Sequence, residues 1–360
     1  PLAQSNHQSL IYIVNEFQKQ TPTFATLKRY DLVTGNKTEI VKLQNASISA
    51  AQISADGQLL LFVSNDGAQQ KLQAIRVDGQ GLQTLYCNSS FLALPQWSSN
   101  QQLIAFEENV SGTAVIFLLH TSNGVLEKVF LQSNAGPRTY LLRTWLDTTH
   151  LYLVRTTTDR APDVLSILTL TRGDNQTPSN LTQVVPSDLG SFDSSYDGTQ
   201  LFVNHNTCAY SCQGPSDITV QPALGGTQHI IFSSAPYAVT NICAVTTRTL
   251  LLAIANQPFR NSQIDQSHNG LWSMHTDGTG LIRLTTDNTN IVTQLNHTSQ
   301  FPWSNVSRDG TMYAATQTSN LKNQHPTYAL IIGSLSGSAP TTIASISDGT
   351  TLDIAGWTTM

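Results

Sequence analysis

The sequence predicts an all-β protein built from repeated four-stranded units. Short apolar segments recur along the whole chain, turns rich in Gly, Asn and Asp separate them, and no segment keeps an apolar period of 3.6 residues. The clearest copies start with an Asp-Gly turn before a strand: Asp56-Gly57, Asp197-Gly198 and Asp309-Gly310. Repeats of about 40–50 residues with about four short strands each are typical of a β-propeller.

The number of blades follows from two separate markers. An equivalent apolar residue in the second strand of each repeat recurs at Ile11, Leu60, Ile104, Leu151, Leu201, Leu251 and Tyr313. The outer hairpins have turns of Gly, Asn and Asp, which tolerate positive φ angles. These turns lie at 34–36, 78–81, 122–124, 173–175, 225–226, 277–280 and 336–338. Both markers predict seven blades.

The C-terminal segment is expected to complete the first blade. Leu352–Thr359 resembles Leu92–Ser99, the innermost strand of the third repeat, and no later repeat follows it. Pairing with the N-terminal strands would remove an open sheet edge. We therefore predict a single β-propeller domain over residues 1–360, with blades at about 8–43 plus 350–358, 47–86, 90–131, 138–185, 188–234, 238–285 and 292–345.

The composition favours an exported protein that binds neither nucleic acid nor membrane. Charged residues make up 11% of the chain, against about 25% in typical proteins. The net charge of −5 and the lack of a basic cluster argue against nucleic acid. No apolar stretch reaches the ~20 residues that span a bilayer. Because the chain starts at Pro1 and not at Met, we expect that an export signal or anchor was removed, which places the protein outside the cell or in the cell envelope.

The four cysteines are expected to behave in two ways. Cys208 and Cys212 share one short loop, so we predict a local disulfide, which would require an oxidising compartment. No second Cys/His pair lies near them, which argues against structural zinc. Cys87 and Cys243 belong to blades that are far apart in the predicted ring, so both are expected to be buried free thiols.

Some segments resemble a known family of repeats. Pro95–Asn100 followed by Leu103–Phe106 is similar to the TolB-type motif, and Asp78–Leu82 and Thr276–Leu284 resemble the outer hairpin of that family. The resemblance to TolB-like, WD40-like propellers covers nearly the whole chain. It departs in blade number, since TolB propellers have six. Seven blades are similar to the propellers of prolyl-oligopeptidase-type enzymes, which place catalysis in a hydrolase domain that these residues do not contain.

Long polar loops are predicted on one face of the propeller. They connect second to third strands at Glu16–Phe24, Arg155–Asp163, His205–Asp217, Asn256–Asn269 and Thr316–Thr327. Long irregular loops are uncommon unless they are functional or disordered. The candidate ligand contacts on this face are Asp159, Arg160, His205, Tyr210, Arg260, Asp265, His268 and His325. The alternative is that each is an ordinary solvated loop residue.

The sequence carries no recognisable catalytic, metal or cofactor motif. No Gly-x-Ser-x-Gly elbow, His-Glu-x-x-His or phosphate-binding Gly loop occurs. We expect a non-catalytic scaffold, with no cofactor or metal, that binds a protein, peptide or cell-envelope glycan through the long-loop face. Two alternatives stay open. One is a propeller lyase or hydrolase with its site at the central opening, and the other is a regulatory ectodomain of a larger membrane protein.

Overall fold

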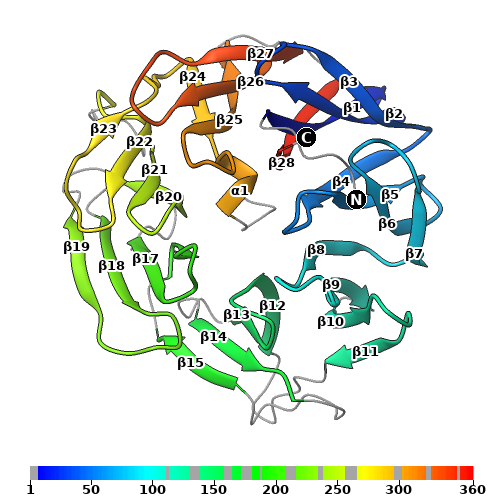
Figure 1. Cartoon of the computed structure of the whole chain (residues 1–360), viewed down its shortest axis with the longest axis horizontal. Helices are drawn as coiled ribbons and strands as arrows, with labels where there is room; N and C mark the ends of the chain where they lie inside the picture. Colours follow the sequence, from blue (N-terminus) through cyan, green and yellow to red (C-terminus); the bar gives the residue numbers. More distant parts are fainter. Residues whose placement is uncertain are drawn as a thin grey trace. The chain divides into compact units, whose positions relative to one another are not determined.

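The computed structural model confirms the predicted fold class, a seven-bladed β-propeller. It describes residues 7–110, 113–129, 138–157, 164–171, 181–186, 189–206, 216–233, 238–255, 266–295, 302–321, 326–346 and 349–359. Within these residues the strands form seven four-stranded antiparallel sheets, the blades, and Figure 1 labels most of their strands. A single turn of helix, α1 (Pro302–Asn305), is the one helix of the described residues.

The chain divides into two compact units. The first comprises Pro1–Pro186, His297–Ser304 and Gly349–Met360, and the second comprises Ser187–Asn296 and Asn305–Asp348. Among the described residues no helix is long and apolar enough to cross a membrane.

The first unit holds four blades. The first blade has the order β28 (Thr350–Thr359), β1 (Gln8–Gln18), β2 (Thr21–Asp31) and β3 (Lys37–Gln44). The second has β4 (Ser47–Ile53), β5 (Leu59–Asn65), β6 (Gln70–Arg76) and β7 (Gln83–Asn88). The third has β8 (Leu92–Trp97), β9 (Leu103–Val110), β10 (Thr113–His120) and β11 (Leu126–Val129). The fourth has β12 (Arg138–Trp145), β13 (His150–Thr157), β14 (Val164–Thr169) and β15 (Leu181–Val185).

The second unit holds three blades. The fifth blade has β16 (Ser191–Ser194), β17 (Gln200–Asn206), β18 (Ser216–Pro222) and β19 (His229–Ser233). The sixth has β20 (Val239–Ala244), β21 (Thr249–Ile254), β22 (Gly270–His275) and β23 (Ile282–Arg283). The seventh has β24 (Ile291–Gln294), β25 (Met312–Ser319), β26 (Thr327–Ser334) and β27 (Thr341–Ile346).

The C-terminal strand joins the N-terminal blade, as predicted. β28 pairs with β1 in antiparallel register from Gln8↔Thr359 to Glu16↔Thr350. The Thr358 hydroxyl also donates a hydrogen bond of 2.7 Å to the Gly57 carbonyl oxygen in the second blade. The first blade is therefore made from both ends of the sequence.

The recurring Asp-Gly turn is held by a serine two residues before the aspartate. In the second blade Ser54 Oγ donates to Asp56 Oδ1 at 2.6 Å and accepts from the Leu59 amide at 2.9 Å, while Gly57 has a φ of 75°. The serine therefore links the end of the inner strand to the start of the next strand. Ser98-Asn100, Ser195-Asp197 and Ser307-Asp309 make the same contacts in the third, fifth and seventh blades.

Apolar side chains fill the space between neighbouring blades within each unit. Phe62 and Ile53 of the second blade pack in one cluster with Ile11 and Leu27 of the first. Buried tryptophans contribute to this packing. Trp97, Trp145 and Trp357 are 5%, 4% and 0% exposed, and Trp97 and Trp145 each belong to a cluster that joins two blades; the side chain of Trp303 lies outside the described residues.

Buried polar side chains also connect successive blades. Asn15 exchanges two hydrogen bonds with the Ile48 backbone, accepting from its amide at 2.7 Å and donating to its carbonyl at 3.0 Å. Gln52 accepts from the Trp97 amide at 2.8 Å. These contacts satisfy backbone groups that burial between blades would otherwise leave unpaired, which makes the blade spacing specific.

Two predictions about the first two blades are wrong. Cys87 is exposed because it lies on β7, the outermost strand of its blade, whereas Cys243 is buried as predicted. The expected long loop Glu16–Phe24 is a tight hairpin, since β1 and β2 continue to Gln18 and Thr21. The two turn residues, Lys19 and Gln20, adopt φ angles of 48° and 70°, which glycine and asparagine usually supply.

Candidate functional site

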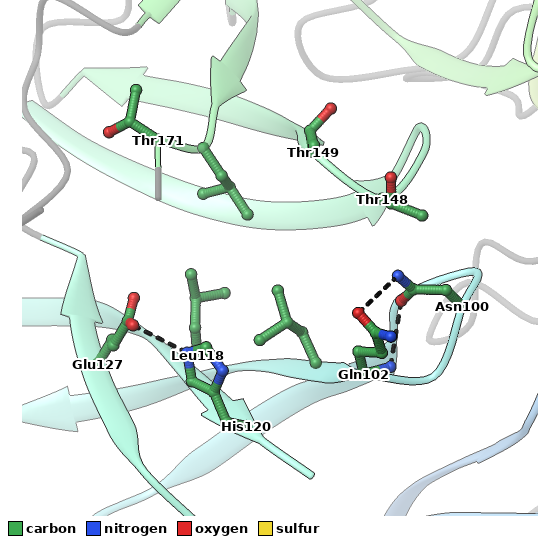
Figure 2. Close-up of a pocket in the computed structure, with 10 residues that line it drawn as sticks. Asn100, Gln102, Leu118, His120, Glu127, Thr148, Thr149 and Thr171 are labelled. Atoms are coloured by element: carbon green, nitrogen blue, oxygen red, sulfur yellow. Dashed lines mark hydrogen bonds and ion pairs between the residues drawn. The ribbon is translucent and has the colours of Figure 1, made fainter. Parts of the chain in front are cut away.

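A pocket of about 520 Å³ lies between the third and fourth blades. It is lined by residues from the β8–β9 turn, the ends of β10 and β14, strand β11 and the β12–β13 turn (Figure 2). The lining residues are Asn100, Gln102, Leu103, Leu118, His120, Glu127, Thr148, Thr149, Leu170 and Thr171. The turns around it connect first to second and third to fourth strands, whereas the long loops that the sequence predicted to be functional connect second to third strands.

The β8–β9 turn presents two amide side chains in a fixed arrangement. Asn100 Oδ1 accepts from Ser98 Oγ at 2.8 Å and from the Gln102 amide at 3.1 Å. Asn100 Nδ2 in turn donates to Gln102 Oε1 at 3.2 Å. This network leaves the Gln102 side-chain amide nitrogen as a donor at the pocket wall.

The β12–β13 turn places Thr148 and Thr149 on the other side of the pocket. Asp147 fixes this turn, because its Oδ1 accepts from the amides of Thr149 at 2.7 Å and His150 at 2.8 Å. Its Oδ2 contacts His150 Nδ1 at 2.7 Å. Burial raises the pKa of Asp147, but these hydrogen bonds outweigh it, and the net pKa lies below the ordinary value of 3.8.

The outer hairpin of the third blade contributes an acid–base pair. His120 Nε2 and Glu127 Oε1 are 2.8 Å apart, and the two side chains are 34% and 38% exposed. The second carboxylate oxygen of Glu127 has no hydrogen-bond partner within the described part of the chain. Figure 2 shows this pair at one end of the pocket, below Thr171.

The floor of the pocket is aliphatic. Leu118 is 2% exposed and belongs to the cluster that joins the third and fourth blades, and Leu103 and Leu170 pack against that cluster. The pocket therefore combines an apolar floor with hydroxyl, amide and carboxylate groups around it. Mostly apolar walls with a few convergent polar groups are typical of ligand sites.

Most of the residues that the sequence predicted as ligand contacts lie outside the described residues. These are Asp159, Arg160, Tyr210, Arg260, Asp265 and His325, together with the disulfide candidates Cys208 and Cys212. His205 is described, but it lies within strand β17 and not in a loop, and its Nε2 is 2.9 Å from Thr219 Oγ1.

His268 is held in an aromatic contact on the sixth blade. Its ring stacks on Trp272 with centroids 6.0 Å apart, and its carbonyl accepts from Trp272 Nε1 at 2.9 Å. The guanidinium of Arg283 lies 5.4 Å from the same indole ring and donates to the Asn269 carbonyl at 2.6 Å. The Trp272 ring therefore contacts two neighbouring side chains, those of His268 and Arg283.

Glu107 and Asp193 are buried carboxylates with raised pKa values, and neither belongs to the pocket. Burial raises the pKa of Glu107 and of Asp193 to about 7 each. Each accepts a hydrogen bond from a backbone amide of the next blade, Leu142 for Glu107 and Ala244, at 2.8 Å, for Asp193. Raised pKa values often mark catalytic acids, but these two groups connect blades. Among the described residues no group of three or more His, Cys, Asp or Glu side chains could hold a metal ion.

The sequence reasoning missed the pocket because it searched the long loops. One signal was available, namely His120 and Glu127 on either side of the third outer hairpin turn, at 122–124. The hairpin register pairs Leu118 with Glu127 and Leu119 with Leu126, which brings the two ionisable side chains together. The opposite wall comes from another blade, which no local pattern indicates.

Comparisons with known proteins identify the fold. No family model matches the chain, and no curated protein matches it. The β-propeller domain of the trilobed protease from Pyrococcus furiosus is similar at a TM-score of 0.60 and 8% identity, with 95% of each chain covered. A structure from a study of two prolyl endopeptidases matches at a TM-score of 0.63 and 10% identity, over 97% of this chain and 49% of that one. TolB from Acinetobacter baumannii matches at 0.49 and 11% identity, over 77% and 63%.

These likenesses confirm the predicted family resemblance at the level of fold. The chain is a propeller similar to those of proteases of the prolyl endopeptidase type, and TolB structures are among its matches. It spans about half the length of the matched prolyl endopeptidase and less than two thirds of the matched TolB. At identities near 10% the fold is shared, and function must be argued from the site.

Proposed function

We propose that the chain is an exported, non-catalytic propeller scaffold that binds a protein or peptide partner. The observation that carries the proposal is the pocket between the third and fourth blades, with its leucine floor and its hydroxyl and amide groups. An extended peptide offers the matching chemistry, because it alternates backbone hydrogen-bonding groups with side chains that fill an apolar site.

A protein or peptide fits this pocket better than a glycan does. Sugar rings usually stack on aromatic side chains, and the described lining of the pocket contains leucines in their place. The long loops with Asp159, Arg160, Tyr210, Arg260, Asp265, His268 and His325, together with His205 of β17, stay a predicted second contact surface. Export is supported by the low charge content and by the predicted disulfide between Cys208 and Cys212.

The test selects peptides that bind the chain and then measures whether they still bind a variant whose pocket is filled. A random peptide library is selected on the immobilised chain, and the enriched peptides are measured against Thr148→Trp, which fills the pocket from an exposed position without removing a described hydrogen bond. Thr247→Trp is the matched control, because Thr247 is exposed in the corresponding turn of the sixth blade. The proposal expects binding that Thr148→Trp abolishes and Thr247→Trp leaves unchanged. Binding to glycans on a parallel glycan array, with no peptide enriched from the library, would contradict the proposal.

A second function, the propeller portion of a hydrolase, is favoured by one comparison. The match to the prolyl endopeptidase structure covers 97% of this chain and 49% of that one. Under this alternative the propeller accompanies a catalytic domain and controls access to it. Hydrolysis of proline-containing peptides by the full gene product, and not by these 360 residues alone, would support it.

A further inference from the structure

The two ends of the pocket differ in chemistry. Figure 2 shows Glu127 and Thr171 at one end and Asn100, Gln102 and Thr148 at the other, with apolar side chains between them. A ligand that fills the whole pocket therefore needs a charged or strongly polar tip, an aliphatic middle and a hydrogen-bonding base. This order of chemical groups along the pocket limits the possible ligands more than the volume of the pocket does.

The charged end selects a cation. Glu127 is the one carboxylate among the described lining residues, which include no Lys or Arg and one basic side chain, its partner His120. One of its oxygens contacts His120 at 2.8 Å, which leaves the other oxygen for a ligand. A single ammonium N–H can reach the open oxygen, whereas the paired bonds that a guanidinium prefers would compete with His120 for the other oxygen. The end therefore suits an ammonium group better than arginine.

The middle of the pocket and its end at Gln102 and Thr148 also fit a lysine residue. Leu103, Leu118 and Leu170 line the pocket with apolar surface, on which a chain of methylene groups can pack. A lysine side chain buries such a stem while its ammonium stays at a polar end. At the base, the Gln102 amide and the Thr148 hydroxyl can donate to or accept from a peptide backbone.

We infer that this pocket holds a lysine side chain of a partner protein, with the ammonium at Glu127 and the partner's backbone at Gln102 and Thr148. The inference rests on the proposed function, because it assumes that the partner is a polypeptide. It adds the identity of the anchoring residue, which the proposed function leaves open.

The test compares capped heptapeptides of Gly, Ser and Ala that differ only in the central residue. Lysine, norleucine, acetyl-lysine and arginine are measured by fluorescence anisotropy. Norleucine keeps an aliphatic stem and lacks the charge. We expect the norleucine and acetyl-lysine peptides to bind about three- to tenfold more weakly than the lysine peptide, as one partly exposed charge-assisted hydrogen bond implies. The preference should fall as salt is raised.

The Glu127→Gln variant tests whether the preference for lysine comes from the ion pair between the ligand ammonium and Glu127. The glutamine keeps an oxygen for His120, so the fold is retained, and the preference for lysine over norleucine should disappear. Glu39→Gln, at an exposed position on the outer strand β3, is the matched control and should keep the preference.

Each result decides the inference. Equal affinity for lysine and norleucine, tighter binding of arginine, or a lysine preference that survives Glu127→Gln overturns it. No binding of the lysine peptide at about 10 mM overturns it as well. In all of these cases the proposed function would still be supported by library peptides whose binding is abolished by Thr148→Trp. The inference and the proposed function can therefore fail separately.

Discussion

Replacing Glu107 by glutamine should stabilise the protein at alkaline pH. Glu107 lies on β9 with 7% of its surface exposed, and its carboxylate accepts a hydrogen bond from the Leu142 amide of the fourth blade. Burial raises its pKa from the ordinary 4.5 to about 7, although the bond from Leu142 and the charge of Arg143 oppose the rise. A glutamine oxygen can accept the same hydrogen bond without a buried charge, as Gln52 does between the second and third blades.

The magnitude follows from the pKa. A rise from 4.5 to about 7 means that the folded state holds the proton more tightly than the unfolded state. The contribution of the group to stability is therefore complete below about pH 4.5 and is lost as the pH rises through 7. The loss amounts to on the order of 3 kcal/mol. Glu107→Gln should raise the free energy of unfolding by about 1–3 kcal/mol at pH 8 and change it little at pH 4.

The assay is thermal unfolding followed by circular dichroism from pH 4 to pH 9. At pH 8 the midpoint of Glu107→Gln should exceed that of the parent protein by roughly 2–6 °C, and the gap should close below pH 5. Glu39→Gln, whose carboxylate is exposed, should show no gap at any pH. A gap that is independent of pH, or a loss of stability at pH 8, would refute the electrostatic reasoning.

Two further predictions concern a glycine and the cysteines. Gly278→Ala should destabilise by about 2–4 kcal/mol in urea titrations, because φ is +85° and the added Cβ would lie 1.8 Å from the Ile231 carbonyl oxygen. Gly124→Ala, with a φ of +70° and open space around the Cβ, should cost only about 1 kcal/mol, so equal losses would contradict this account. An aqueous thiol reagent should label Cys87 in the native protein and Cys243 only after unfolding, since burial raises the pKa of the Cys243 thiol and excludes the reagent. Peptide mapping by mass spectrometry checks the order, and early labelling of Cys243 would contradict it.

The fold could be predicted because its signals are local and repeated. The Ser54, Asp56 and Gly57 turn is written in a few consecutive residues and recurs along the chain, so blade number and strand order follow from the sequence. Cys87 was misjudged because the burial of an outermost strand depends on which face it presents. The pocket could not be predicted, because its walls lie on two blades and approach each other only when the blades pack. The long-loop candidates stay predictions, apart from His205 and His268, whose contacts are described.

Because the first blade contains strands from both ends of the chain, it can be completed only after the last strand, β28, has been synthesised. On the ribosome β1 emerges early, yet its inner partner β28 starts only at Thr350. Until then one edge of β1 has unpaired backbone groups, and an unpaired strand edge can recruit other chains. A truncation that removes β28 would thus leave this edge of β1 open and the molecule prone to aggregate. A circular permutant that joins the two ends and opens the chain elsewhere should avoid this delay.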